Sequence, residues 1–205
     1  MASRAAVTIR PPLALPGQRV GVMGGSFNPP HDGHLIVART AVRRLQLDQL
    51  WWLVTPGNPL KAHDGLAPLE QRMEACRTLA GTDPRMKVTS FEAQLGSAYT
   101  ALTLEYLKRR FPDVRFVWVM GADNLANFHC WQNWRGIAGM MPIAVVDRPG
   151  WRLRALASPA AQALRNSQIP ETGAASLATI PTPCWTFLTS KLSSLSSTEL
   201  RRRGA

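Results

Sequence analysis

The sequence contains few cysteines and no long apolar run, and each of these shortages excludes a class of protein. Its 205 residues include three cysteines, Cys76, Cys130 and Cys184, an odd number without a C-x-x-C pair. That usage argues against a disulfide framework and against a cysteine-rich zinc site. No apolar stretch reaches the roughly 18 residues that a membrane-spanning helix needs. We therefore expect a reduced, cytoplasmic protein with no membrane partner.

The beginning of the chain also lacks a recognisable secretory signal. It is basic, but it has no apolar region of about 7–15 residues of the kind such a signal requires. We interpret residues 1–18 as a short N-terminal extension and residues 19–205 as a single domain. With 45% apolar and 18% charged residues, a chain of this length can bury one sizeable core.

Acidic residues are scarce in this chain. Thirteen Asp and Glu stand against 24 Lys and Arg, which gives a net charge of +11. Twenty of the basic residues are Arg, whose planar guanidinium binds phosphate through two parallel hydrogen bonds. A polyanion is therefore one candidate partner, and a solvated basic surface without a specific target is the other. Charge alone favours the second and cannot distinguish DNA, RNA and a small phosphorylated substrate.

Apolar runs rich in β-branched and aromatic residues alternate with amphipathic helical patterns. The runs predict strands at 19–23, 49–55, 86–89, 114–120, 143–147 and 184–188. Helical periodicity covers 35–45, 69–79, 100–111 and, less clearly, 160–165. This alternation predicts an α/β fold, a Rossmann-like doubly wound sheet that is mostly parallel and has helices on both faces.

Ligands of such sheets bind beyond the carboxyl ends of the strands, so the loops at that edge should carry the chemistry. The expected loops follow Met23, Thr55, Met120 and Leu188.

The first of these loops reads GGSFNPPHDGH from Gly24 to His34. It matches neither the dinucleotide fingerprint G-x-G-x-x-G nor the phosphate loop G-x-x-x-x-G-K-[ST]. Two adjacent glycines allow backbone N–H groups to approach a ligand closely. A helix that begins at about His34 would also direct its positive dipole end toward the same space. We therefore expect an anion to bind there.

His31 and His34 stand three positions apart across Gly33. Three interpretations compete for this pair: helix capping, a zinc site, and hydrogen bonds to phosphate oxygens. Zinc would need further ligands, and His63 and His129 stand in no recognisable ligand spacing. We predict no metal ion held by protein residues alone. Beside a triphosphate, both imidazoles should be drawn toward their charged form.

Near the other end, the segment LSSTELR runs from Leu195 to Arg201. Ser196 and Glu199 have the spacing of a capping box, which would place Ser197 and Thr198 at a helix N-terminus and create a second anion cradle. An ordinary capped helix is the alternative.

The two segments together resemble the two signatures of the nucleotidylyltransferase superfamily, H/T-x-G-H and I-S-S-T-x-I-R. Further segments resemble the bacterial nicotinate-nucleotide adenylyltransferase family within it. These are Trp118–Leu125 with Phe128, Trp131 and Trp134; Thr55–Lys61; Ser97–Leu104; and Asp147–Gly150. The resemblance runs from about Val20 to Arg203. It implies transfer of the adenylyl group of ATP to nicotinate mononucleotide, with Mg²⁺ bound to ATP and pyrophosphate released.

The resemblance also implies a role for each matched residue. His31, His34 and Arg201 would be catalytic. ATP would bind Gly24, Gly25, Ser26, Gly121, Asp123, Ser197 and Thr198. Nicotinate mononucleotide would bind Lys61, Tyr99, Thr100, Trp131 and Arg148. For Trp131, ordinary packing is the alternative, because most of the seven tryptophans must be packing residues.

Two positions depart from the family pattern. Asn28 stands where many members have Asp, which removes one negative charge from the loop, and Gln132 stands where an aromatic residue is common. Other acceptors, such as nicotinamide mononucleotide or phosphopantetheine, are alternatives, because the phosphate-binding segments are shared and only the acceptor pocket differs. The net charge of +11 also permits a basic nucleic-acid-binding module. We expect no nucleic-acid partner, and the sequence leaves the oligomeric state open, a homo-oligomer included.

Overall fold

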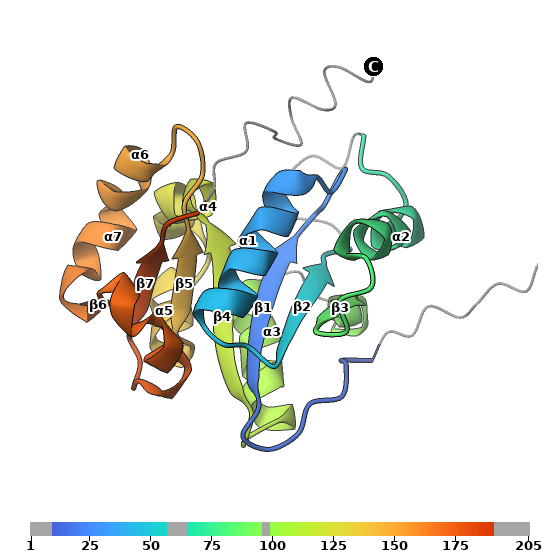
Figure 1. Ribbon diagram of the computed structural model, residues 1–205, viewed down its shortest axis with the longest axis horizontal. Helices are drawn as coiled ribbons and strands as arrows, with labels where there is room; N and C mark the ends of the chain where they lie inside the picture. Colours follow the sequence, from blue (N-terminus) through green and yellow to red (C-terminus); the bar gives the residue numbers. More distant parts are fainter. Residues whose placement is uncertain (1–9, 57–64, 96–98, 191–205) are drawn as a thin grey trace, which may run out of the picture.

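The computed structural model describes residues 10–56, 65–95 and 99–190 (Figure 1). A sheet of seven strands in the order β3-β2-β1-β4-β5-β7-β6 forms its centre, and every neighbouring pair is parallel. The strands are β1 (Arg19–Gly25), β2 (Gln49–Val54), β3 (Met86–Thr89), β4 (Arg115–Gly121), β5 (Ile143–Val146), β6 (Gln168–Ile169) and β7 (Trp185–Leu188).

Helices connect the strands and cover the sheet. The α-helices are α1 (Asp32–Arg44), α2 (Leu69–Ala80), α3 (Thr100–Arg110), α4 (Ala122–Asn127), α5 (Trp134–Met140), α6 (Arg152–Leu156) and α7 (Pro159–Ala163). The 3-10 helices are η1 (Phe91–Gln94), η2 (Phe128–Cys130), η3 (Arg165–Ser167) and η4 (Glu171–Thr179). None of the helices in the described ranges has the length and apolar character needed to cross a bilayer.

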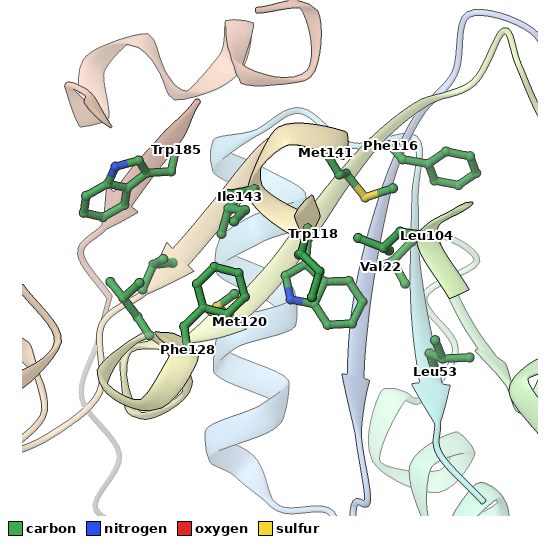
Figure 2. Close-up of a cluster of buried hydrophobic side chains, with 14 of the residues drawn as sticks. Val22, Leu53, Leu104, Phe116, Trp118, Met120, Phe128, Met141, Ile143 and Trp185 are labelled. Atoms are coloured by element: carbon green, nitrogen blue, oxygen red, sulfur yellow. The ribbon is translucent and has the colours of Figure 1, made fainter. Parts of the chain in front are cut away.

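Both faces of the sheet are buried, which explains why its strands read as nearly continuous apolar runs. On β2, Trp52 and Val54 pack with residues of α1, α2 and η4 on one face. Trp51 and Leu53 point to the other face, where α3 to α7 contribute to a second cluster. Figure 2 shows this second cluster, with Trp118 of β4 among its labelled side chains. The alternation follows from the two-residue period of a strand.

The structure confirms the predicted fold class, and it shows that the described sheet is parallel throughout. The six predicted strands and the helices at 69–79 and 100–111 agree within two residues. Two differences have local causes. β6 has only two residues, too few to leave a periodic pattern. The first helix begins at Asp32 rather than at about His34, because His31 itself provides the cap.

Parallel strands end along one edge of the sheet, so the loops after β1, β2, β4, β5 and β7 meet there. In Figure 1 this is the edge toward which the arrowheads point, and α1 begins at the same edge in front of the sheet. The candidate site lies here.

Candidate active site

Two histidines cap the start of α1. His31 is the N-cap residue, and its Nδ1 atom accepts a hydrogen bond of 3.0 Å from the Gly33 N–H. The His31 N–H in turn donates to Nδ1 of His34 over 3.2 Å. The two ring centroids lie 3.9 Å apart. Since each Nδ1 is an acceptor, the proton of each neutral ring is on Nε2, which leaves an N–H donor for a ligand.

Gly33 is required by the close packing of these rings. A Cβ atom at this position would lie 2.8 Å from Cε1 of His31 and 2.9 Å from Nη2 of Arg148. Both distances are too short for ordinary contacts between heavy atoms. The glycine in H-x-G-H therefore makes room for an imidazole on one side and a guanidinium on the other.

The protein alone holds both imidazoles neutral at pH 7. Burial and, to a smaller extent, the positive charge of Arg148 lower the pKa of His31 to about 4, against the opposing effect of the nearby carboxylates. The pKa of His34 also lies well below its usual range, because of burial, His31 and Arg148. This direction is opposite to the one we predict beside a triphosphate. The effect of the nucleotide stays a prediction.

The loop before the histidines is packed onto aromatic side chains. Phe27 has a left-handed backbone with φ of 46° and a side chain that is 2% exposed. Its ring meets those of His34 and Trp52 at centroid distances of 4.9 Å and 5.3 Å. At Gly24, a Cβ atom would lie 2.7 Å from Cη2 of Trp118, so only glycine allows this approach. The aromatic core therefore sets the position of the loop.

Asp123 and Arg148 meet beside the histidines. Nη1 of Arg148 lies 3.1 Å from Oδ2 of Asp123, and the two side chains are 13% and 29% exposed. The other carboxylate oxygen, Oδ1, is buried and has no hydrogen-bond partner within the described ranges. This oxygen is able to accept a hydrogen bond from a ligand. The structure thus places Arg148 next to His31 and Asp123.

The predicted acceptor-side residues lie around the start of α3 and in the segment after α4. Tyr99 is the N-cap residue of α3 and is 36% exposed, and Thr100 is half-buried in the first turn. Trp131 is also half-buried, with its ring edge-on to those of Trp118 and Phe128 at centroid distances of 6.3 Å and 5.4 Å. Figure 2 shows these two partner rings. Trp131 therefore packs on the core and keeps part of its surface accessible.

A buried carboxyl group lies beneath this side of the site. The Thr103 hydroxyl donates to Oε1 of Glu92 over 2.6 Å and lies 3.5 Å from the Tyr99 carbonyl oxygen. Burial raises the pKa of Glu92 to about 7, and the bond from Thr103 offsets only part of that effect. Our sequence analysis missed Glu92, because a single acidic residue in a short segment leaves no periodic signal.

Asn28 makes two hydrogen bonds to the segment that precedes α2. Its Nδ2 donates to the Gly65 carbonyl over 2.9 Å, and the Ala67 N–H donates to its Oδ1 over 3.2 Å. An aspartate could accept the second bond but could not donate the first, which is a reason for Asn at this position in this chain.

Arg72 is a second residue that the sequence analysis missed. It is 2% exposed, on the inner face of α2. A signal was available, since it stands three positions after Leu69 and four before Cys76, within the apolar stripe of the helix.

Several predicted site residues lie outside the described ranges. These are Lys61, Ser197, Thr198 and Arg201. Whether a second helix start meets the first around one triphosphate therefore stays a prediction. The last described residue, Ser190, lies at the carboxyl end of β7, where its hydroxyl donates to the Asp147 carbonyl over 3.1 Å. The described residues contain no group of three His, Cys, Asp or Glu side chains that could hold a metal ion.

Comparisons with known proteins identify the family and support the fold. The model of the cytidylyltransferase-like family matches residues 22–203. A probable nicotinate-nucleotide adenylyltransferase of Methylorubrum extorquens is 58% identical over 185 residues. The aligned region covers 90% of this chain and 100% of that protein. A probable nicotinate-nucleotide adenylyltransferase of Rhizobium meliloti is 59% identical over 182 residues, and the aligned region covers 89% of this chain and 96% of that protein.

Among solved structures, the Plasmodium falciparum nicotinic acid mononucleotide adenylyltransferase complexed with NaAD has a TM-score of 0.68. The superposition covers 90% of this chain and 83% of that one, and the two are 16% identical. At that identity the likeness supports the fold alone.

Proposed function

The chain belongs to the cytidylyltransferase-like family, and we propose that it transfers the adenylyl group of ATP to nicotinate mononucleotide, forming nicotinic acid adenine dinucleotide and pyrophosphate in NAD biosynthesis. One structural observation carries the proposal. The stacked pair His31 and His34 caps α1 through Nδ1 and retains an Nε2–H on each ring, at the carboxyl edge of a parallel sheet. Such an arrangement suits the binding of a polyphosphate.

The reaction requires alignment more than acid–base chemistry. An oxygen of the mononucleotide 5′-phosphate forms a bond to the α-phosphorus of ATP, and the bond from that phosphorus to the bridging oxygen breaks. The electron pair leaves with pyrophosphate. The attacking oxygen is already anionic, so no general base is needed, and the protein must hold two polyanions that repel each other.

His31, His34 and the first turn of α1 would stabilise the departing phosphates. The two Nε2–H groups supply donors, and the N–H groups of the first turn add a positive partial charge. Neither imidazole has to take up a proton to act in this way, since each neutral ring already carries a proton on Nε2. As negative charge grows on the leaving oxygens, these donors bind it more strongly, which lowers the barrier.

The other contacts divide between the two substrates. Gly24, Gly25 and Ser26 would lie along the ATP phosphates, and Gly121 and Asp123 along its nucleoside, where Oδ1 of Asp123, unpaired among the described residues, accepts a hydrogen bond. Tyr99, Thr100 and Trp131 would hold the nicotinate moiety. Arg148 and Lys61 would bind phosphate. Ser197, Thr198 and Arg201 would hold the phosphates that leave as pyrophosphate.

The donor set of the site fits a metal ion that arrives with the nucleotide. Near the histidines the described structure provides isolated carboxylates, such as Asp123 in its pair with Arg148, rather than a metal cage. Mg²⁺ commonly keeps phosphate and water ligands and uses few protein groups. When bound with ATP, it would neutralise part of the polyphosphate charge.

A pyrophosphate-release assay tests the proposal. Purified protein is given ATP and Mg²⁺ with nicotinate mononucleotide, nicotinamide mononucleotide or phosphopantetheine in separate reactions. We expect turnover to be fastest with nicotinate mononucleotide, and formation of the dinucleotide is followed by chromatography. Faster turnover with either other acceptor would reassign the substrate, and no release with any of them would reject nucleotidyl transfer.

A further inference from the structure

Arg72 carries a buried positive charge that is bonded to backbone carbonyls. Its side chain reaches from α2 to four backbone carbonyl oxygens. Nε bonds to Ala67 over 2.8 Å, Nη1 to Ser26 over 2.6 Å and to Thr55 over 2.8 Å, and Nη2 to Pro56 over 3.3 Å. No ion pair joins it to an acidic residue in the described part of the chain.

This arrangement costs free energy that packing alone would not require. Burial lowers the pKa of Arg72, which shows that its environment disfavours the charge. A guanidinium nevertheless remains protonated in proteins, because its intrinsic pKa is so high. An apolar side chain would fill the same space without burying a charge, but it would not provide donors for the four carbonyl oxygens. The charge and the fork of donors are therefore the properties that distinguish Arg72 from a packing residue.

The four carbonyls belong to segments that surround the candidate site. Ser26 lies in the loop after β1, and Thr55 and Pro56 follow β2. The next residue after Ser26 is Phe27, whose left-handed backbone is unfavourable for a bulky residue and persists only where neighbours hold it. Phe27 contacts the ring of His34. A continuous set of contacts thus leads from Arg72 through Ser26 and Phe27 to His34.

We propose that Arg72 is a positioning residue for adenylyl transfer, which sets the spacing of the loops after β1 and β2 and, through Phe27, the placement of His34. Its charge also adds to the positive potential beneath the phosphate side of the site. This inference rests on the proposed function. If Arg72 acts in this way, loss of its planar fork should lower kcat, and loss of its charge should weaken ATP binding.

Two substitutions separate these contributions. Arg72→Lys keeps the charge but loses the planar fork, and Arg72→Met loses both with a chain of similar length. In the assay with ATP, Mg²⁺ and nicotinate mononucleotide, we expect Arg72→Lys to lower kcat by about tenfold with little change in the KM for ATP. Arg72→Met should lower kcat by about a hundredfold, the size of loss that a small misplacement of reacting groups causes, and should also raise the KM for ATP.

Arg77 of the same helix provides the matched control. It is exposed and pairs with Glu74 over 3.0 Å, away from the carbonyl cluster. Arg77→Lys and Arg77→Met should leave kcat and KM unchanged. Circular dichroism and thermal melting are measured for all variants, and kinetics are measured well below each Tm.

The outcomes are distinct. A folded Arg72→Lys protein with lower kcat supports the proposal. Wild-type kcat and KM in Arg72→Lys overturn it, with or without a lower Tm, because the residue would then serve stability alone. Loss of the folded state in both variants overturns it for the same reason. If the wild-type protein releases no pyrophosphate, the proposed function itself fails, a result that needs no variant.

Discussion

The starts of α1 and α3 each lie against a buried ionisable group, a pair of bases at α1 and an acid at α3. Both helices begin at the carboxyl edge of the sheet, and each has a buried ionisable group at its first turn. At α1 this group is the His31 and His34 pair, whose pKa values are lowered. At α3 it is Glu92, bonded to Thr103, whose pKa is raised to about 7. Burial therefore favours the neutral form in both places.

The difference lies in what each neutral group can offer a ligand. The imidazoles satisfy the helix through Nδ1 and keep Nε2–H donors, which suits a polyanion. Glu92 is 2% exposed and accepts a hydrogen bond from Thr103 in the first turns of α3, whose N-cap residue is Tyr99. Under the proposed function, His31 and His34 would contact the substrate directly, whereas Glu92 would hold in place the helix whose first residues contact it. Substitutions at these two helix starts and in the loop before α1 test this contrast.

The largest effect is expected at His34. In the proposed mechanism, His34→Ala removes an Nε2–H donor that binds most strongly in the transition state, so kcat should fall by roughly 10²–10³-fold. His34→Gln, which retains an N–H donor, should recover part of that loss. Steady-state pyrophosphate release measures both. An unchanged kcat in His34→Ala would remove the residue from the catalytic machinery.

Glu92→Gln should change how stability depends on pH. The folded pKa of about 7 exceeds the unfolded value of 4.5, so the native state binds more protons in this range. The free energy of unfolding therefore contains a term that is present below pH 4.5 and is lost as pH rises to about 7. Replacing Glu92 removes this term, and the variant should gain roughly 2–3 kcal/mol relative to wild type between about pH 4.5 and about pH 8.

Urea unfolding of both proteins at several pH values measures that difference. His31 provides the internal contrast, because its pKa falls from 6.5 to about 4 and its contribution to stability is lost as pH falls through that window. His31→Gln should therefore change the pH dependence in the opposite sense. Parallel stability curves for Glu92→Gln and wild type would show that the carboxyl group is not buried in its neutral form.

Gly33→Ala tests the close packing at α1. The new Cβ would lie 2.8 Å from Cε1 of His31, so the ring or the helix start must move. We expect kcat/KM to fall by about tenfold because the imidazoles are displaced. The free energy of unfolding should also fall by roughly 1–3 kcal/mol, the cost of overpacking. Gly139→Ala in α5, where a Cβ meets nothing within 4 Å, serves as the control. It should leave activity intact and raise Tm slightly, because Ala favours helix.

The smallest effect is expected at Asn28. Asn28→Asp removes the Nδ2 donor to the Gly65 carbonyl and adds a negative charge near the phosphate side of the site. The loss of one hydrogen bond costs about 1 kcal/mol of stability. The added charge should raise the KM for ATP by a few fold, most clearly at low salt. A variant with lower stability and an unchanged KM would separate the structural role from any electrostatic one.

Much of the site could be located from spacing alone. His31, Gly33 and His34 stand in a loop that directly follows an apolar run, and any parallel sheet places that loop at its carboxyl edge. The supporting residues could not be located in this way. Arg72 acquires its role from carbonyls up to 46 positions away in the chain, and Glu92 acquires its pKa from burial that no local pattern records.

The sequence by itself determined the alternation of strands and helices and the place of His31 and His34 in the loop after the first strand, because both depend on residues close together in the chain. The tertiary structure decided the ionisation of those histidines and of Glu92, the pairing of Arg148 with Asp123, and the carbonyl cluster around Arg72. These properties depend on desolvation and on contacts between distant segments. The completed fold decides which ionisable side chains are buried and which hydrogen-bonding groups find partners.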